Sequence, residues 1–180
     1  RNMLNRFGPI NEALLSLNLI SEPLPFLTDP TFAKITVLVV NLWVGIPYIM
    51  LMATGILMNI PQDLYESSRI DGAGSVQQFT KITLPYMLFV TGPYLLTSFT
   101  ANINNFNVIY LLTGGGPSTE QYYQAGKTDI LVTWLFKLTM SSQDYGLAAA
   151  IGILVFIVCA TLSLIIYNNS KSMKDEEAFS

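Results

Sequence analysis

Histidine is absent from this chain of 180 residues, and cysteine occurs only once, as Cys159. A disulfide within the chain therefore cannot form, and a zinc or copper site built from the protein alone is not expected. Charged residues make up 12% of the chain, whereas soluble domains have about 25%. No basic run is present, which argues against a nucleic-acid partner. We expect no metal site and no cofactor.

Long apolar runs take the place of the missing charge, and hydrophobic residues make up 51% of the chain. Three stretches, 35–58, 85–112 and 147–167, match the roughly 20 apolar residues that a helix needs to cross a bilayer. The first contains Gly45-Ile46-Pro47, which predicts a kink. The composition therefore predicts an all-α integral membrane protein. No signal peptide is predicted, and because Arg1 stands where a start methionine would, we expect a piece of a longer chain.

The segments outside these runs are polar or broken by proline. Residues 1–34 contain a short amphipathic run, which predicts a helix lying at the membrane surface. Residues 113–146 begin with a glycine-rich turn, and their mixed stretch 128–139 is too short and polar to span, so it predicts a second interfacial helix. The tail 168–180 is polar. Lysines and arginines number four on one side of the membrane and five on the other. Their distribution therefore does not indicate which side is cytoplasmic.

The second apolar run carries an unusual number of polar side chains. At spacings of four and three residues, Ser98, Asn102 and Asn105 share one face of a helix. A buried amide without a partner costs several kcal/mol, so this face must meet other helices or a wet cavity. Both interpretations stay open at this point: the amides join helices, or they bind a polar solute.

The segment 59–84 is longer than a connector between two spans requires, which is about 2–8 residues. We expect a short helix over 61–70, with Glu66 and Arg69 close enough to pair across one turn. Gly72 and Gly74 are suited to end it, and Ser75 with Gln78 predicts a capping box that starts a second helix. Apolar side chains, among them Leu64, Ile70 and Phe79, would then lie on the surface. They favour a docking partner.

Five residues of this segment, Glu66, Gly72, Ile82, Leu84 and Pro85, match in identity and spacing a known loop. The segment 59–84 resembles the EAA loop of binding-protein-dependent ABC importer permeases, with Ser67 and Ser68 in place of the two alanines. The stretches 60–66, 71–74, 113–117 and 145–150 extend the resemblance to the sugar permeases, above all to the larger subunit of maltose/maltodextrin importers. The resemblance covers essentially the whole chain.

The resemblance implies a type-I ABC importer permease bundle, of which this chain is the C-terminal three-span part, in the bacterial cell membrane. The loop 59–84 and the tail would be cytoplasmic, and residues 1–34 and 113–146 would face outward. Implied partners are a cytoplasmic ATPase dimer that hydrolyses the ATP, a second permease subunit, a solute-binding protein, a sugar and the bilayer. The residues implied to couple to the ATPase are Leu64, Glu66, Ser67, Ser68, Asp71, Gly72, Ile82, Leu84 and Pro85.

The resemblance also implies a substrate site in the membrane. Its residues would be Gly45, Tyr48, Ser98, Asn102 and Asn105, because these positions match sugar-contacting positions of the family. Hydroxyl and amide groups suit sugar hydroxyls, and an aromatic ring can stack on a pyranose. Ala101 stands where the maltose permease has an aromatic residue, which leaves room for a different or longer oligosaccharide. We expect Asn104 and Asn107 to contact neighbouring helices.

Other functions fit the sequence less well. Gly126-Lys127-Thr128 matches the end of a P-loop, but Gln121 stands where its first glycine is required. We therefore expect no ATPase site and no enzyme activity in this chain. A structural or assembly subunit would explain the small residues of the last span, but not the polar face of the second. A permease for another solute is the remaining alternative.

Overall fold

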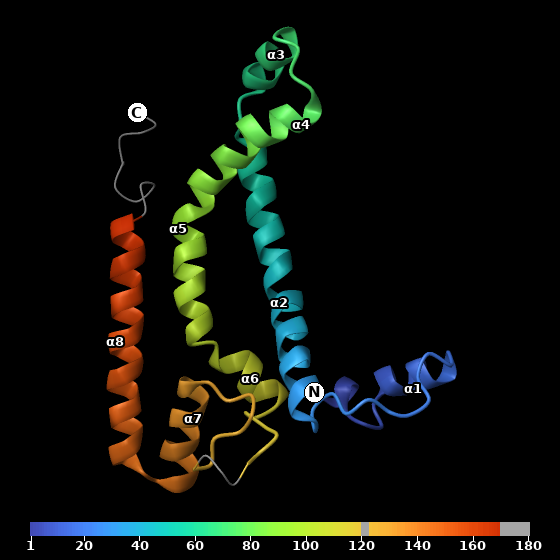
Figure 1. The fold of residues 1–180 in the computed structure, drawn as a ribbon, viewed down its shortest axis with the longest axis vertical. Helices are drawn as coiled ribbons and strands as arrows, with labels where there is room; N and C mark the ends of the chain where they lie inside the picture. Colours follow the sequence, from blue (N-terminus) through green and yellow to red (C-terminus); the bar gives the residue numbers. More distant parts are fainter. Residues whose placement is uncertain (120–122, 170–180) are drawn as a thin grey trace. The chain divides into compact units, whose positions relative to one another are not determined.

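The computed structural model describes residues 1–119 and 123–169, and every regular element in these ranges is helical. Three long helices dominate (Figure 1): α2 (Pro30–Met58), α5 (Leu84–Ile103) and α8 (Tyr145–Asn169). The shorter elements are η1 (Asn2–Leu4), α1 (Pro9–Ser16), α3 (Gln62–Ile70), α4 (Ser75–Gln78), η2 (Phe79–Thr83), α6 (Phe106–Leu112), α7 (Leu131–Lys137) and η4 (Leu138–Ser142). Nearly all of the predicted tail 168–180 lies outside the described residues.

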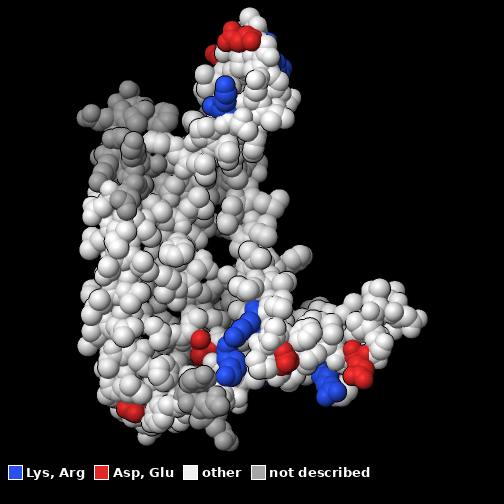
Figure 2. All heavy atoms as spheres, viewed as in Figure 1, with Lys and Arg blue, Asp and Glu red and all other residues white. Residues whose placement is uncertain are grey.

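Three helical segments are long and apolar enough to cross a membrane: Pro30–Met58, Ser75–Ile103 and Tyr145–Asn168. Lys34 is the only charged residue within α2, and neither α5 nor α8 contains any. Figure 2 shows the same division on the face that it draws: no charged side chain lies along α8, whereas acidic and basic side chains lie on the α3–α4 loop. The expected all-α membrane protein with three spans is thereby confirmed.

The spans bury little of their own surface. In their most apolar stretches only 6%, 11% and 6% of the residues are buried within the chain. Large apolar side chains such as Trp43 and Phe156 are mostly exposed. Because such side chains are stable only in an apolar environment, these helices require lipid or further helices around them.

The first span begins earlier than expected, because Asp29 caps it. The Oδ1 atom of Asp29 accepts hydrogen bonds from the backbone N–H groups of Thr31 (2.8 Å) and Phe32 (3.0 Å). Pro30 occupies the first helical position, where its missing N–H is no loss. The helix therefore starts five residues before Ile35 and continues through Pro47 to Met58.

The second span does not reach Leu112 as a single helix, which corrects the expected span 85–112. α5 ends at Ile103, and α6 starts at Phe106. The N–H of Asn104 bonds to Ala101 O (3.1 Å) and that of Asn105 to Asn102 O (3.3 Å), so the last turn tightens to i→i+3 bonding. Asparagine favours such breaks because its side chain competes with the backbone for hydrogen bonds.

The chain divides into two compact units, which we describe separately. Unit 1 comprises residues 1–43 and 101–160. Its apolar core consists of Leu138, Ala148 and Ile151, against which side chains of α7 and α8 pack. A methyl group on Gly152 would lie 3.4 Å from Leu135 Cδ1. The small residues Ala148 and Gly152 therefore let α8 pack against α7.

Unit 2 comprises residues 44–100 and 161–180, the latter described to residue 169. Its part of α2 runs into the loop containing α3 and α4, and α5 returns from that loop (Figure 1). The rings of Tyr48 on α2 and Tyr94 on α5 lie 5.5 Å apart between centroids. The two halves of this hairpin are thus in contact through aromatic side chains.

Candidate functional site

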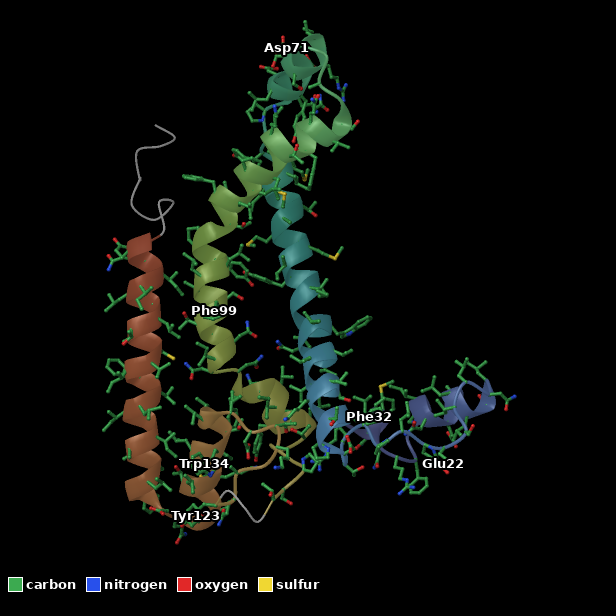
Figure 3. All side chains as sticks on the ribbon, in the orientation of Figure 1. Glu22, Phe32, Asp71, Phe99, Tyr123 and Trp134 are labelled. Carbon is green, nitrogen blue, oxygen red and sulfur yellow. The ribbon has the colours of Figure 1, made fainter. Side chains whose placement is uncertain are left out.

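The loop between α2 and α5 is a folded element rather than a plain connector. α3 ends in a Schellman motif: the N–H of Gly72 bonds to Arg69 O (3.0 Å), and the N–H of Ala73 bonds to Ser68 O (2.8 Å). Gly72 has a φ of +83°, the left-handed conformation that this motif requires. In Figure 3, Asp71 marks the turn at the end of α3. The predicted glycine turn is confirmed at Gly72, whereas Gly74 has an ordinary φ of −76°.

A small polar network attaches α3 to the helices that follow it. The Oη of Tyr65 lies 2.8 Å from the Oγ1 of Thr83. The Nε2 of Gln78 donates to Tyr65 O (3.1 Å) and to Ser68 Oγ (2.8 Å). Gln78 and Thr83 are more than nine-tenths buried. Since buried polar groups that are all paired favour one arrangement, this network fixes the angle between α3 and α4.

Two predicted details of the loop are wrong. Glu66 and Arg69, two described residues that are close enough along the helix to pair, form no ion pair in the structure. The second helix is capped one residue earlier than expected: Gly74 is the N-cap, and its N–H donates to Gln77 Oε1 (3.2 Å). Gln78 is unavailable for capping because its amide lies in the buried network with Tyr65.

Most of the predicted coupling residues lie on the surface of this loop. Glu66 extends into solvent from α3, and Ile70, which we expected as an apolar surface residue beside the coupling set, is 87% exposed on the same helix. A cleft of about 310 Å³ adjoins Glu66 and Arg69 and reaches the end of α2 at Met58. The exposed members are Leu64, Glu66, Ser67, Asp71, Gly72, Leu84 and Pro85, whereas Ser68 and Ile82 are half-buried.

In unit 1 the structure brings together three amide side chains, which we call the amide cluster: Asn41, Asn102 and Asn105. The Nδ2 of Asn41 donates to Asn102 Oδ1 (3.1 Å), and the Nδ2 of Asn105 donates to Asn41 Oδ1 (2.6 Å). Asn102 and Asn105 thus meet as predicted. Asn41 was missed, although it is the only amide in the first apolar run.

The other predicted substrate residues belong to unit 2. Tyr48 is 58% exposed and contacts Tyr94, and Gly45 has open space where a side chain would be. Ser98 is half-buried on α5. Asn104 donates from Nδ2 to the Sγ of Cys159 on α8 (3.3 Å), which confirms the expected helix contact for this residue. Asn107 is exposed.

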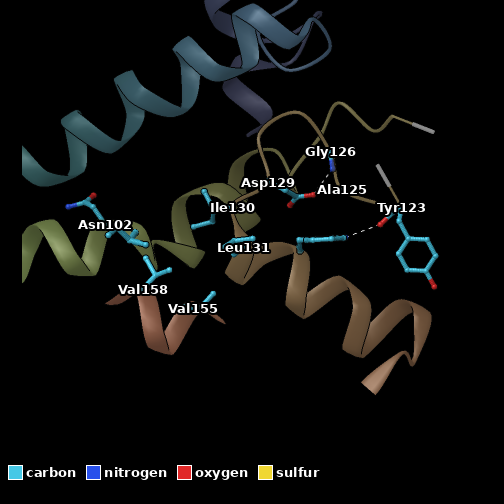
Figure 4. Close-up of a pocket in the computed structure, with 11 residues that line it drawn as sticks. Asn102, Tyr123, Ala125, Gly126, Asp129, Ile130, Leu131, Val155 and Val158 are labelled. Atoms are coloured by element: carbon cyan, nitrogen blue, oxygen red, sulfur yellow. Dashed lines mark hydrogen bonds between the residues drawn. The ribbon is translucent and has the colours of Figure 1, made fainter. Parts of the chain in front are cut away.

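Two cavities adjoin the amide cluster within unit 1. One, of about 460 Å³, is lined by all three amides together with Lys34, Lys127 and Thr128, among others. The second, of about 820 Å³, is mainly apolar and extends from Asn102 to Tyr123 (Figure 4), and Trp134 also lines it. The Nε1 of Trp134 donates to Tyr123 O (2.9 Å). Polar and aromatic groups at the edge of a cavity can orient a sugar.

Comparison with known proteins identifies the family. A family described as the inner membrane component of binding-protein-dependent transport systems matches residues 7–174. The chain belongs to this family of permease components. It is accordingly a multi-pass protein of the bacterial cell membrane, and three of its helical segments are long and apolar enough to cross one.

Individual relatives of this permease component carry names of sugar transporters. The galactooligosaccharides transport system permease protein GanP of Bacillus subtilis is 44% identical over 170 residues, which are 94% of this chain and 40% of that protein. The maltodextrin transport system permease protein MdxF of the same organism is 40% identical over 186 residues, 98% of this chain and 42% of that protein. The chain spans about two fifths of the length of these relatives.

A solved structure supports the fold of the permease component. The chain is similar to a bacterial alginate ABC transporter in complex with an alginate pentasaccharide-bound periplasmic protein. The TM-score is 0.79 at 25% identity, over 94% of this chain and 57% of that chain. The helical arrangement expected for an ABC importer permease is confirmed.

Proposed function

We propose that this chain is part of the permease subunit of an ATP-driven importer of oligosaccharides of the maltodextrin type. It would hydrolyse no ATP itself: partner ATPase subunits would do so, and the permease would open alternately to each side of the membrane. A second permease subunit and an extracytoplasmic solute-binding protein would complete the importer. The names of its relatives and its likeness to an alginate transporter support a sugar as cargo.

The α3–α4 loop supports the coupling part of this proposal. The polar network around Gln78 and the Schellman motif at Gly72 make the loop a small rigid body. Leu64 and Ile70 nevertheless remain exposed on it. A rigid element that exposes apolar and acidic side chains on α3, between the first two spans, is suited to bind in a cleft of an ATPase. Movement of the ATPase would then be transmitted to α2 and α5.

The amide cluster supports the substrate part. Each of its amides has a carbonyl oxygen that accepts and an NH₂ group that donates, so the cluster can exchange its internal bonds for bonds to sugar hydroxyls. The cavity of about 460 Å³ beside it falls within the range of small-molecule sites. Gly45, Tyr48 and Ser98 remain proposed contacts, and Tyr48 would stack on a sugar ring.

Reversing the charge of Glu66 tests the function. The full-length subunit, reconstituted with its ATPase, second permease and binding protein, is assayed for sugar uptake and ATP hydrolysis. Glu66 is proposed to face a basic residue of the ATPase. We therefore expect Glu66→Lys to leave membrane insertion intact and to lower uptake per ATP at least tenfold, because like charges facing each other at an interface cost several kcal/mol. Glu22→Lys is the matched control: the same charge reversal at an exposed site outside the loop. Equal uptake by both variants would refute the coupling role.

A further inference from the structure

Asp129, which lines both cavities of unit 1, forms an ion pair with Lys137. The Nζ of Lys137 and the Oδ2 of Asp129 are 2.6 Å apart, and the Asp129 side chain is only 3% exposed. The same carboxylate accepts hydrogen bonds from the N–H of Gly126 (2.7 Å, Figure 4) and the Oγ1 of Thr133 (2.8 Å). An ion pair of this kind is poor evidence for stability, because desolvation offsets its attraction. Its value lies in fixing one arrangement.

Two glycines allow the backbone to approach this pair. A methyl group on Gly115 would lie 1.8 Å from Asp129 Oδ1 and 2.5 Å from Lys137 Nζ. A methyl group on Gly126 would lie 2.0 Å from Gly115 O. Gly115 also has a φ of +82°, which other residues rarely adopt. The segment 113–117 is therefore in direct contact with the segment 126–130, with no side chain between them.

Hydrogen bonds join the same two segments. The N–H of Thr128 donates to Gly115 O (3.1 Å), and the N–H of Lys127 donates to Pro117 O (2.9 Å). The hydroxyl of Thr128 donates to Gly116 O (2.6 Å). Segment 126–130 is thus held by backbone bonds on one side and by the ion pair on the other.

This segment forms part of the wall of both cavities. Gly126, Asp129 and Ile130 line the larger cavity, and Lys127, Thr128, Asp129 and Ile130 line the smaller one beside the amide cluster. We propose that Asp129 is a positioning residue of the sugar site: paired with Lys137, it holds segment 126–130 as the wall that faces the amide cluster. This inference rests on the proposed transport function. The backbone N–H of Gly126 is bonded to the Asp129 carboxylate, so the backbone of the segment moves when that carboxylate moves. Loss of the ion pair therefore loosens the wall.

Transport kinetics of the reconstituted importer test the proposal, with a maltodextrin mixture and a galactooligosaccharide mixture as probes. We expect Asp129→Asn and Lys137→Met to raise the KM for uptake at least tenfold, with the maximal rate within about twofold of the unmodified protein. Lys137→Arg keeps the charge and should keep the KM. An unchanged KM in both variants overturns the proposal, and so does a loss of protein from the membrane that accounts for the whole defect.

Backbone hydrogen exchange separates this inference from the proposed function. In Asp129→Asn we expect the amides of Lys127 and Thr128 to exchange at least tenfold faster, while those of α5 keep their protection. Unchanged protection at Lys127 and Thr128 overturns the positioning role. If the unmodified importer takes up neither sugar mixture, the proposed cargo is wrong, and the exchange result still decides whether Asp129 holds the wall.

Discussion

Two substitutions in the loop, Gly72→Ser and Gly74→Ser, add the same side chain at two backbone conformations. Comparing them shows how far backbone strain in the turn controls docking to the ATPase. Gly72 and Gly74 are both exposed, and neither has an atom within 4 Å of the position that a side chain would take. Only their backbone conformations differ. Gly72 has a φ of +83°, whereas Gly74, at a φ of −76°, is the N-cap of α4.

The expected magnitudes follow from these angles. A side chain in the left-handed conformation costs about 1–2 kcal/mol. Gly72→Ser should therefore lower the equilibrium constant for forming the turn by about 5- to 30-fold. The bonds at risk are those of the N–H groups of Gly72 and Ala73. At Gly74 serine is a favoured N-cap residue, so Gly74→Ser should be neutral or slightly stabilising.

The assay is the titration of the reconstituted permease with its purified ATPase, followed by sugar-stimulated hydrolysis. Gly72→Ser should raise the ATPase concentration needed for half-maximal stimulation, by at most roughly 5- to 30-fold, the full effect of about 1–2 kcal/mol. Gly74→Ser should match the unmodified protein. If the two variants behave alike, or if only Gly74→Ser is impaired, the conformation of the loop does not control docking.

Three further predictions concern the network, the amides and the packing of α8. In a double-mutant cycle of Tyr65→Phe and Thr83→Val, thermal unfolding in detergent should give a coupling of about 0.5–1.5 kcal/mol, and a coupling of zero would contradict the bond. Asn102→Leu with Asn105→Leu should abolish most sugar uptake while the protein still reaches the membrane; normal uptake of every sugar tested would leave this face a packing surface only. Gly152→Leu should destabilise the fold by about 1–3 kcal/mol through overpacking against α7, and an unchanged melting temperature would argue against that contact.

Apolar runs and one loop motif were enough to predict the class of fold. Runs of about 20 apolar residues can satisfy their backbone in lipid only as helices, so the three spans followed from composition. The glycine turn was predictable too, since Gly72 follows a polar helix at the position where a left-handed residue is required. The family membership rests on the match over residues 7–174.

Other features could not be predicted from the sequence, because they depend on hydrogen bonds that form only in the folded chain. The break between α5 and α6 is seen in i→i+3 backbone bonds, and apolar periodicity carries no signal of these bonds. Asn41 could be recognised as part of the amide cluster only from the structure, in which it is hydrogen-bonded to Asn102 and Asn105. The pairing of Asp129 with Lys137 was hidden because the two residues are eight apart and meet through a turn followed by a helix.

The central claim is that the α3–α4 loop contacts the ATPase. A photo-crosslinking amino acid placed at Ile70, which is 87% exposed, tests it directly, and the same group at Trp43, 79% exposed on an apolar span, is the control. In the assembled importer we predict a crosslink from position 70 to the ATPase subunit and none from position 43. Crosslinking from neither position, or from position 43 alone, would contradict the coupling account.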